Sequence, residues 1–251
     1  MEKCEQGFRS GLIYYVMDFI DGQSLSEQIK AGKPFTEHEG MLILRQVLDA
    51  LEEIHAQNPQ MFHLDIKPSN LMKDSKGNVW LIDFGSSKQL DVAQGITVSS
   101  GITLTKGYAP SELEDGKKER IGAWTDLYEL GATIYNLLTC NHPPTSSEIL
   151  EESEKAFNYP SSISPNIKEL VSWMMNPIRK ERPQSVEEVK SRIEMGEIAV
   201  NADDEETVLY EDVREDTIIG GSNEGVVNGK DFHSQPVDIK RNDEEDENVI
   251  W

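Results

Sequence analysis

The chain has 251 residues, and its 46 acidic and 24 basic side chains give a formal net charge of −22 at pH 7. Because this charge repels the phosphates of nucleic acids and the headgroups of anionic lipids, we expect no nucleic acid and no membrane among its partners. Two cysteines exclude a disulfide framework, no apolar run approaches the ~18 residues of a membrane-spanning helix, and the start MEKCEQ does not resemble a signal peptide, so we expect a cytoplasmic protein.

The apolar pattern predicts a mainly helical domain with a few strands near its start. Strands are expected at 13–17 (IYYVM) and at 79–82 (VWLI), the second after a turn-rich segment. Apolar residues recur at helical spacing between 37 and 56, and the segment 125–139 is apolar nearly all round. These patterns predict an amphipathic helix followed by a buried one. Helix starts with capping boxes, in which a hydroxyl precedes a glutamate by three residues, are expected at Ser24, Thr36 and Ser185.

The segment HLDIKPSNLM and the later DFG carry the residue types that phosphoryl transfer requires. This reaction needs a metal held against the phosphates, an acceptor for the proton of the attacking hydroxyl, and cations that neutralise charge. We expect Asp65 to accept the proton and Lys67 to lie beside the transferred phosphoryl group. Asn70 and Asp83 offer the oxygen ligands that Mg²⁺ requires.

These motifs resemble those of the protein kinase family, in which a catalytic loop and a metal-binding loop follow in this order. The resemblance covers about residues 11–192. It implies a kinase-like large helical lobe with a remnant of the small-lobe sheet, spanning 1–195. It also implies serine/threonine protein kinase activity with ATP and Mg²⁺ as cofactors and a protein as substrate. Asp65 then corresponds to the catalytic aspartate, Lys67 to the lysine typical of serine/threonine kinases, and Asn70 and Asp83 to the metal ligands.

The same resemblance assigns roles to residues outside these two loops. YYVMDFIDG resembles the strand that enters the nucleotide hinge, where the backbone of Asp18 and Ile20 would meet adenine and Met72 would line the site. Residues expected to support the site are His63 and Phe84 through packing, Gly85 in the DFG motif, Thr105 as a brace of the catalytic loop, Asp126 as a holder of its backbone, and Glu112 paired with Arg182.

Two departures from the family pattern bear on activity. Leu64 occupies the position of the arginine that usually binds a phosphate on the activation segment. No glycine-rich loop, strand lysine or helix glutamate precedes the hinge, so we expect a kinase domain that is incomplete at its N-terminus and a hinge strand without neighbours. Two interpretations follow: a truncated active kinase, favoured because the four residues for chemistry are intact, or an inactive kinase-like scaffold.

The C-terminal segment is expected to be a disordered acidic tail over 196–251. Residues 201–251 hold 16 acidic against 4 basic side chains and few large apolar ones that could offset the entropy of ordering. EETVL and EDTII place Thr207 and Thr217 after acidic residues and before two aliphatic ones. We expect phosphorylation there to recruit a phosphothreonine-binding partner; a tail that merely solvates the domain is the alternative.

Overall fold

The structure is a computed structural model that describes residues 5–9, 12–16, 19–86, 88–91, 95–96, 105–115 and 120–197. The chain divides into two units, 1–204 and 205–251, and the second lies outside the described residues. Almost the whole of the predicted acidic tail therefore also lies outside them.

Helices make up most of the described part. None of them is long and apolar enough to cross a membrane. The α-helices are α1 (Leu25–Lys30), α2 (Glu37–His55), α3 (Ser111–Glu114), α4 (Ala123–Thr139), α5 (Ser146–Glu152), α6 (Pro165–Met174) and α7 (Val186–Arg192). Shorter turns are η1 (Pro68–Asn70), η2 (Phe84–Ser86), η4 (Ser153–Ala156), η5 (Arg179–Glu181) and the π-helical η6 (Ile193–Glu197).

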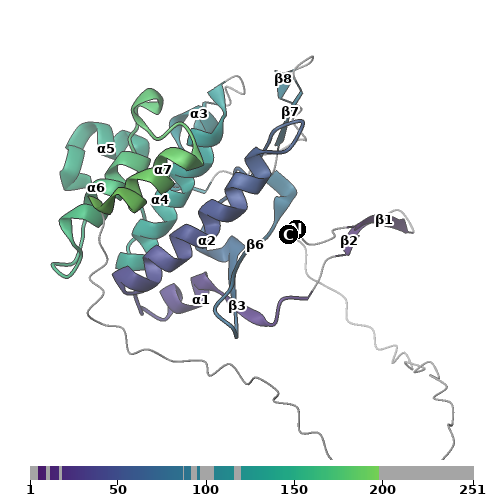
Figure 1. Ribbon diagram of the computed structural model, residues 1–251, viewed down its shortest axis with the longest axis horizontal. Helices are drawn as coiled ribbons and strands as arrows, with labels where there is room; N and C mark the ends of the chain where they lie inside the picture. Colours follow the sequence, from purple (N-terminus) through teal and green to yellow (C-terminus); the bar gives the residue numbers. More distant parts are fainter. Residues whose placement is uncertain are drawn as a thin grey trace, which may run out of the picture. The chain divides into compact units, whose positions relative to one another are not determined.

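Helices α2 and α4 form the centre of the core, as the apolar pattern predicts. Figure 1 shows α4 and α7 beside α2, and α4 packs against both α2 and α6 while α7 packs against α2. On α4 every residue from 125 to 138 is buried. On α2 the buried residues lie at helical spacing along one face, which gives the helix its amphipathic pattern. The core is therefore helix on helix.

Side-chain caps start five of the described helices, α1, α2, α5, α6 and α7, but only one of the three expected capping boxes is complete. At α2 the Thr36 hydroxyl accepts the Glu39 amide while the Glu39 carboxylate accepts the Thr36 amide. Ser24 instead accepts the amide of Ser26, two residues on. At α7 Ser185 caps Glu188, whose carboxylate accepts the amide of Gln184 rather than that of Ser185. A cap hydroxyl thus locates a helix start without specifying the reciprocal bond.

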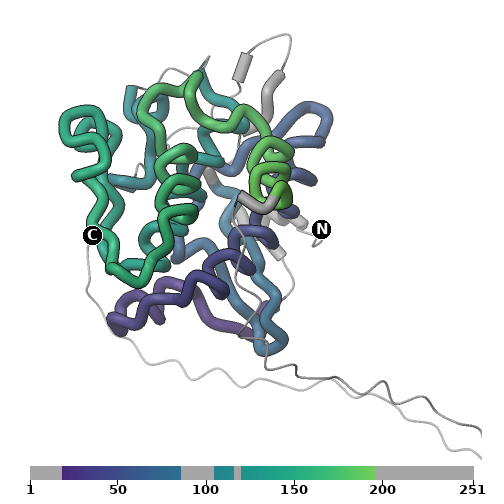
Figure 2. Tube along the Cα trace, turned by 60° about the vertical axis from the view of Figure 1, so that its left-hand side comes forward, coloured from purple at the N-terminus to yellow at the C-terminus, as the bar shows by residue number. Residues whose placement is uncertain are grey.

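Three small sheets complete the fold. They are β1 (Glu5–Arg9) with β2 (Leu12–Val16), β3 (Gly22–Ser24) with β5 (Leu71–Asp74) and β6 (Val79–Leu81), and β4 (Met61–Phe62) with β7 (Lys88–Asp91) and β8 (Gly95–Ile96), each pair antiparallel. In Figure 2 the β5–β6 hairpin lies beside the β3–α1 segment, in agreement with the register Ser24 opposite Met72.

The strand that was expected to enter the hinge, β2, differs from the prediction in its pairing. It pairs with β1 over five residues, from Glu5 opposite Val16 to Arg9 opposite Leu12, so it has one neighbour rather than none. The sequence between the two strands is Ser10-Gly11, a dipeptide that is common in turns, and this is a sequence signal for the pairing. The fold class is confirmed: a helical kinase-like lobe with a small sheet remnant.

Candidate active site

Asp65, Lys67 and Thr105 form one polar cluster at the catalytic loop, defined here as residues 63–70 between β4 and β5. Lys67 Nζ lies 2.8 Å from Asp65 Oδ1 and donates to Thr105 Oγ1 at 3.2 Å. The Thr105 hydroxyl lies 3.5 Å from Asp65 Oδ1, to which it donates. Asp65 is 9% exposed and therefore lies at the edge of the core. Two donors, the ammonium of Lys67 and the hydroxyl of Thr105, hold its carboxylate there.

Asn70 holds Asp65 from the other side. It ends the turn η1, which begins with a proline whose fixed backbone angle suits the first position of a helical turn. Its Nδ2 donates to the Asp65 carbonyl at 2.8 Å and to Asp65 Oδ2 at 2.9 Å. The amide of Ile82 donates to the Asn70 carbonyl at 2.9 Å. This bond extends the β5–β6 ladder by one residue, so that Asn70 lies opposite Ile82, the residue before Asp83.

Asp83 lies in a backbone conformation that non-glycine residues seldom adopt. Its φ is 65°, and its Oδ1 accepts the amide of Gly85 at 3.2 Å. The Asp83 side chain is exposed, whereas Phe84 turns its ring against His63 with centroids 4.9 Å apart and remains 45% exposed. Such left-handed residues concentrate at functional sites, where the surrounding structure maintains the strain.

Asn70 and Asp83 fit a magnesium ion by the chemistry of their donors. The Nδ2 of Asn70 is committed to Asp65, whereas its Oδ1 accepts a 3.4 Å hydrogen bond from Ser69 Oγ and keeps a second lone pair for a ligand. Asp83 contributes an exposed carboxylate. Mg²⁺ is commonly held by one or two such oxygens together with phosphate oxygens and water. Within the described ranges no group of three or more His, Cys, Asp or Glu side chains could hold a metal ion instead.

Asp126 organises the backbone of the catalytic loop from the first turn of α4. Its carboxylate accepts the amides of His63 at 3.0 Å and Leu64 at 2.8 Å, and it lies 2.8 Å from His55 Nε2. The ring of His63 contacts the carbonyl of Ile82 at 3.1 Å. Burial lowers the pKa of His63 despite the nearby carboxylates of Asp126 and Asp65, which favours a neutral packing role. The contact of His55 with Asp126 is not among the predictions from the sequence. The only sequence signal for it is the position of a histidine at the C-terminal end of the predicted amphipathic helix.

Glu129, one turn after Asp126, was also missed. Its Oε2 accepts the amide of Ile66 at 2.8 Å, in the middle of the catalytic loop. Burial, followed by the negative charge of Asp126, raises its pKa well above the ordinary glutamate value. The signal in the sequence is that Asp126 and Glu129 are the two charged residues of a helix that is otherwise uncharged.

Leu64, which stands in place of the usual arginine, is part of an apolar cluster. It is 1% exposed and has a left-handed backbone with φ of 62°. The cluster joins the catalytic loop to residues of the segment 109–121. Its other buried members are Phe62, Ala109, Leu113 and Ile121. The side chain at this position therefore makes apolar contacts and carries no charge that could bind a phosphate.

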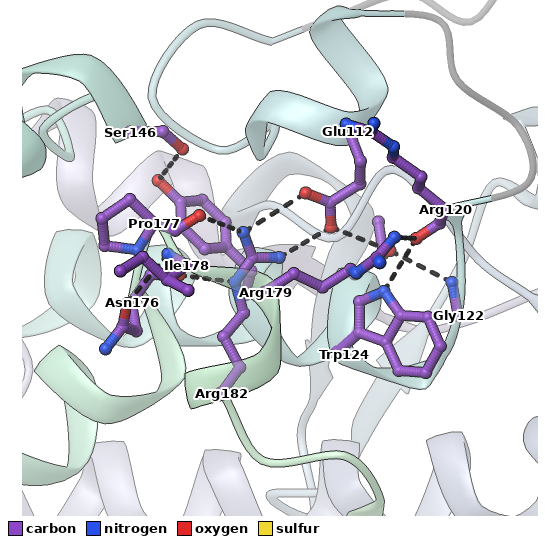
Figure 3. Close-up of polar contacts among 12 residues, drawn as sticks. Glu112, Arg120, Gly122, Trp124, Ser146, Asn176, Pro177, Ile178, Arg179 and Arg182 are labelled. Carbon is purple, nitrogen blue, oxygen red and sulfur yellow. Dashed lines mark hydrogen bonds and ion pairs between the residues drawn. The ribbon is translucent and has the colours of Figure 1, made fainter.

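Glu112, on α3, and Arg182, directly after η5, form a buried ion pair (Figure 3). Arg182 is 2% exposed and Glu112 4%, and their closest atoms, Nη1 and Oε1, are 2.6 Å apart. The guanidinium also donates to the carbonyls of Asn176 and Pro177 and lies 4.7 Å from the ring centroid of Tyr128. Each guanidinium nitrogen has a partner, which a buried cation requires.

Of the remaining predicted residues, two lie within the described part of the chain and three lie outside it. Ile20 is half-buried and its carbonyl accepts the amide of Gly22 at 3.0 Å, while Met72 is half-buried on β5. Asp18, Thr207 and Thr217 lie outside the described residues, so their expected roles stay predictions.

Comparisons with known proteins agree with this geometry. The family profile described as "Protein kinase domain" matches residues 5–192. Serine/threonine-protein kinase F of Synechocystis is 32% identical over 188 residues, which are 73% of this chain and 36% of that protein. Protein kinase 2 of Dictyostelium discoideum is 29% identical over 65% of this chain and 33% of its own length, and the probable serine/threonine-protein kinase PknB of Bifidobacterium longum is 34% identical over 56% and 20%. The chain spans about a third or less of these relatives, and it belongs to the protein kinase family.

Proposed function

We propose that this chain is the catalytic part of a serine/threonine protein kinase. The observation that carries the proposal is the arrangement around Asp65, whose carboxylate is held by Lys67, Asn70 and Thr105 at the edge of the core. A carboxylate beside a lysine supplies a proton acceptor and a positive charge, two of the contributions that a protein makes to phosphoryl transfer.

Each residue has a defined task in this reaction. Bound Mg²⁺ supplies charge neutralisation at the phosphates, and Asn70 and Asp83 would hold it. Asp65 orients the substrate hydroxyl and accepts its proton as the new oxygen–phosphorus bond forms and the bond from the γ-phosphorus to the ADP oxygen breaks. Lys67 offsets the negative charge on the transferred group. Asn70 keeps the Asp65 carboxylate from turning away, because it binds both the carbonyl and the side chain of that residue.

The test is transfer of labelled γ-phosphate to a generic protein substrate by the gene product that contains this chain. Asp65→Asn should lower kcat by at least about a hundredfold, because it removes the proton acceptor. Glu53→Gln is the matched control, since Glu53 is an exposed carboxylate on α2 away from the catalytic loop. Equal rates in the Asp65→Asn variant and the wild type, or no transfer by the wild type with Mg²⁺ and ATP present, would refute the proposal.

A kinase-like scaffold without activity is the second candidate. The two candidates differ in their response to nucleotide. Mg²⁺-dependent ATP binding that is lost in Asp83→Asn supports the kinase, whereas unchanged thermal unfolding with and without Mg²⁺ and ATP supports the scaffold.

A further inference from the structure

Two side chains of α4 hold both backbone polar groups of Ile66, the residue between Asp65 and Lys67. Glu129 Oε2 accepts the Ile66 amide at 2.8 Å, and Thr133 Oγ1 donates to the Ile66 carbonyl at 3.0 Å. These side chains are four residues apart on the helix, so they lie on the same face, one turn apart. Each peptide unit that flanks Ile66 is therefore tied to α4.

Glu129 makes its hydrogen bond to Ile66 from a buried position, where a carboxyl group is costly. Glu129 is 2% exposed, and Ile66 and Thr133 are fully buried. The ionisable groups that act on Glu129 are the carboxylates of Asp126 and Asp65, which repel a negative charge, and the ammonium of Lys67, which attracts it. A carboxyl group is an expensive occupant of such a site unless a hydrogen bond requires it. An apolar side chain would leave the buried Ile66 amide without its acceptor.

We propose that Glu129 and Thr133 are positioning residues that clamp Ile66 and thereby set the geometry of the Asp65–Lys67 pair. The two members of this pair have Ile66 as their shared neighbour, and their charged atoms are 2.8 Å apart. A rotation of either peptide unit of Ile66 would move one charged group relative to the other. The catalytic consequence of the clamp rests on the proposed kinase function, whereas the clamp itself does not.

The charge of Glu129 is not what the clamp uses. Burial raises the pKa of this carboxyl group, and an acceptor oxygen is present in both the protonated and the ionised form. A glutamine at this position has the same shape and also presents an acceptor oxygen. Glu129→Gln should therefore preserve the clamp, whereas Glu129→Leu should abolish half of it and Thr133→Val the other half.

The experiment measures amide hydrogen exchange at Ile66 in the full chain, with thermal unfolding recorded for each variant. We expect Ile66 to exchange at the wild-type rate in Glu129→Gln, and about tenfold to a hundredfold faster in Glu129→Leu, relative to core amides of α4. Thr139→Val is the control, because the Thr139 hydroxyl binds backbone at the C-terminal end of α4, namely the carbonyl of Tyr135 and the amide of Asn141. Equal Ile66 exchange in wild type, Glu129→Gln and Glu129→Leu would overturn the clamp, as would loss of protection in Glu129→Gln as large as in Glu129→Leu.

Kinetics test the consequence for the Asp65–Lys67 pair. With the gene product that contains the chain, Glu129→Leu and Thr133→Val should lower kcat about tenfold or more while the KM for ATP changes little, because misplacement of a reacting group acts on the chemical step. Glu129→Gln should restore kcat. If Glu129→Leu alone fails to fold, Thr133→Val carries the test. A wild type without activity would refute the proposed function but leave the exchange result intact, and wild-type kcat in variants with fast Ile66 exchange would refute the positioning role.

Discussion

The buried pair of Glu112 and Arg182 allows a prediction whose size follows from the structure. In Arg182→Met the guanidinium is replaced by an apolar side chain that reaches into the same space. Glu112 then keeps one described side-chain donor, the hydroxyl of Thr125 at 3.2 Å, in a site that is 4% exposed. An uncompensated buried charge of this kind costs about 3–5 kcal/mol in the free energy of unfolding.

The matching change on the other side, Glu112→Gln, should cost less. Glutamine retains an acceptor oxygen, and Arg182 keeps its bonds to the carbonyls of Asn176 and Pro177. We expect about 1.5–3 kcal/mol, the range for a hydrogen bond to a charged group. The double variant should cost less than the sum of the two single ones, because the second change removes a charge that the first had already left without its partner.

Urea unfolding followed by tryptophan fluorescence measures all three variants. Lys190→Met is the control for a solvent-exposed pair, since Lys190 binds Asp49 and Glu52, which are both exposed. That control should lose no more than about 1 kcal/mol. A loss in Arg182→Met as small as in Lys190→Met, or strict additivity in the double variant, would refute the reasoning that this pair is a desolvated structural unit.

Three further predictions concern single positions. Burial raises the pKa of Glu129 in the folded state, so the contribution of this group to the stability of the wild type is lost as pH rises above the ordinary glutamate pKa. Glu129→Gln lacks this loss, and its free energy of unfolding should gain on that of the wild type by at most about 1.4 kcal/mol per pH unit. Urea midpoints between pH 5 and 8 measure this, and a constant difference would contradict it. Gly107→Ala should lower the melting temperature, because Gly107 has φ of +79° and an added Cβ would overlap the carbonyl oxygen of Pro143; an unchanged melting temperature would contradict this. Because Leu64 packs in an apolar cluster instead of meeting a phosphate, phosphatase treatment should leave phosphate transfer by the intact protein unchanged, and a large loss in rate would point to another phosphate-binding group.

Local sequence patterns determined the principal helices and the identity of the residues for chemistry. The spacing of apolar residues located α2 and α4 to within two residues, because burial of one face or of the whole surface imposes that spacing. The order of Asp65, Asn70 and Asp83 in their motifs was enough to propose a phosphoryl-transfer site, since metal ligation restricts these positions to oxygen donors.

Tertiary structure alone decided which side chains support that site. Asp126 and Glu129 reach backbone amides more than sixty residues earlier in the chain, and such pairs depend on how α4 packs beneath the catalytic loop. Leu64 could be recognised as a departure from the family, but only the fold shows that it packs with Ala109 and Leu113. The physical reason is the same in each case: periodicity records how much of a residue is buried, whereas the identity of its partner depends on the packing of elements distant in sequence.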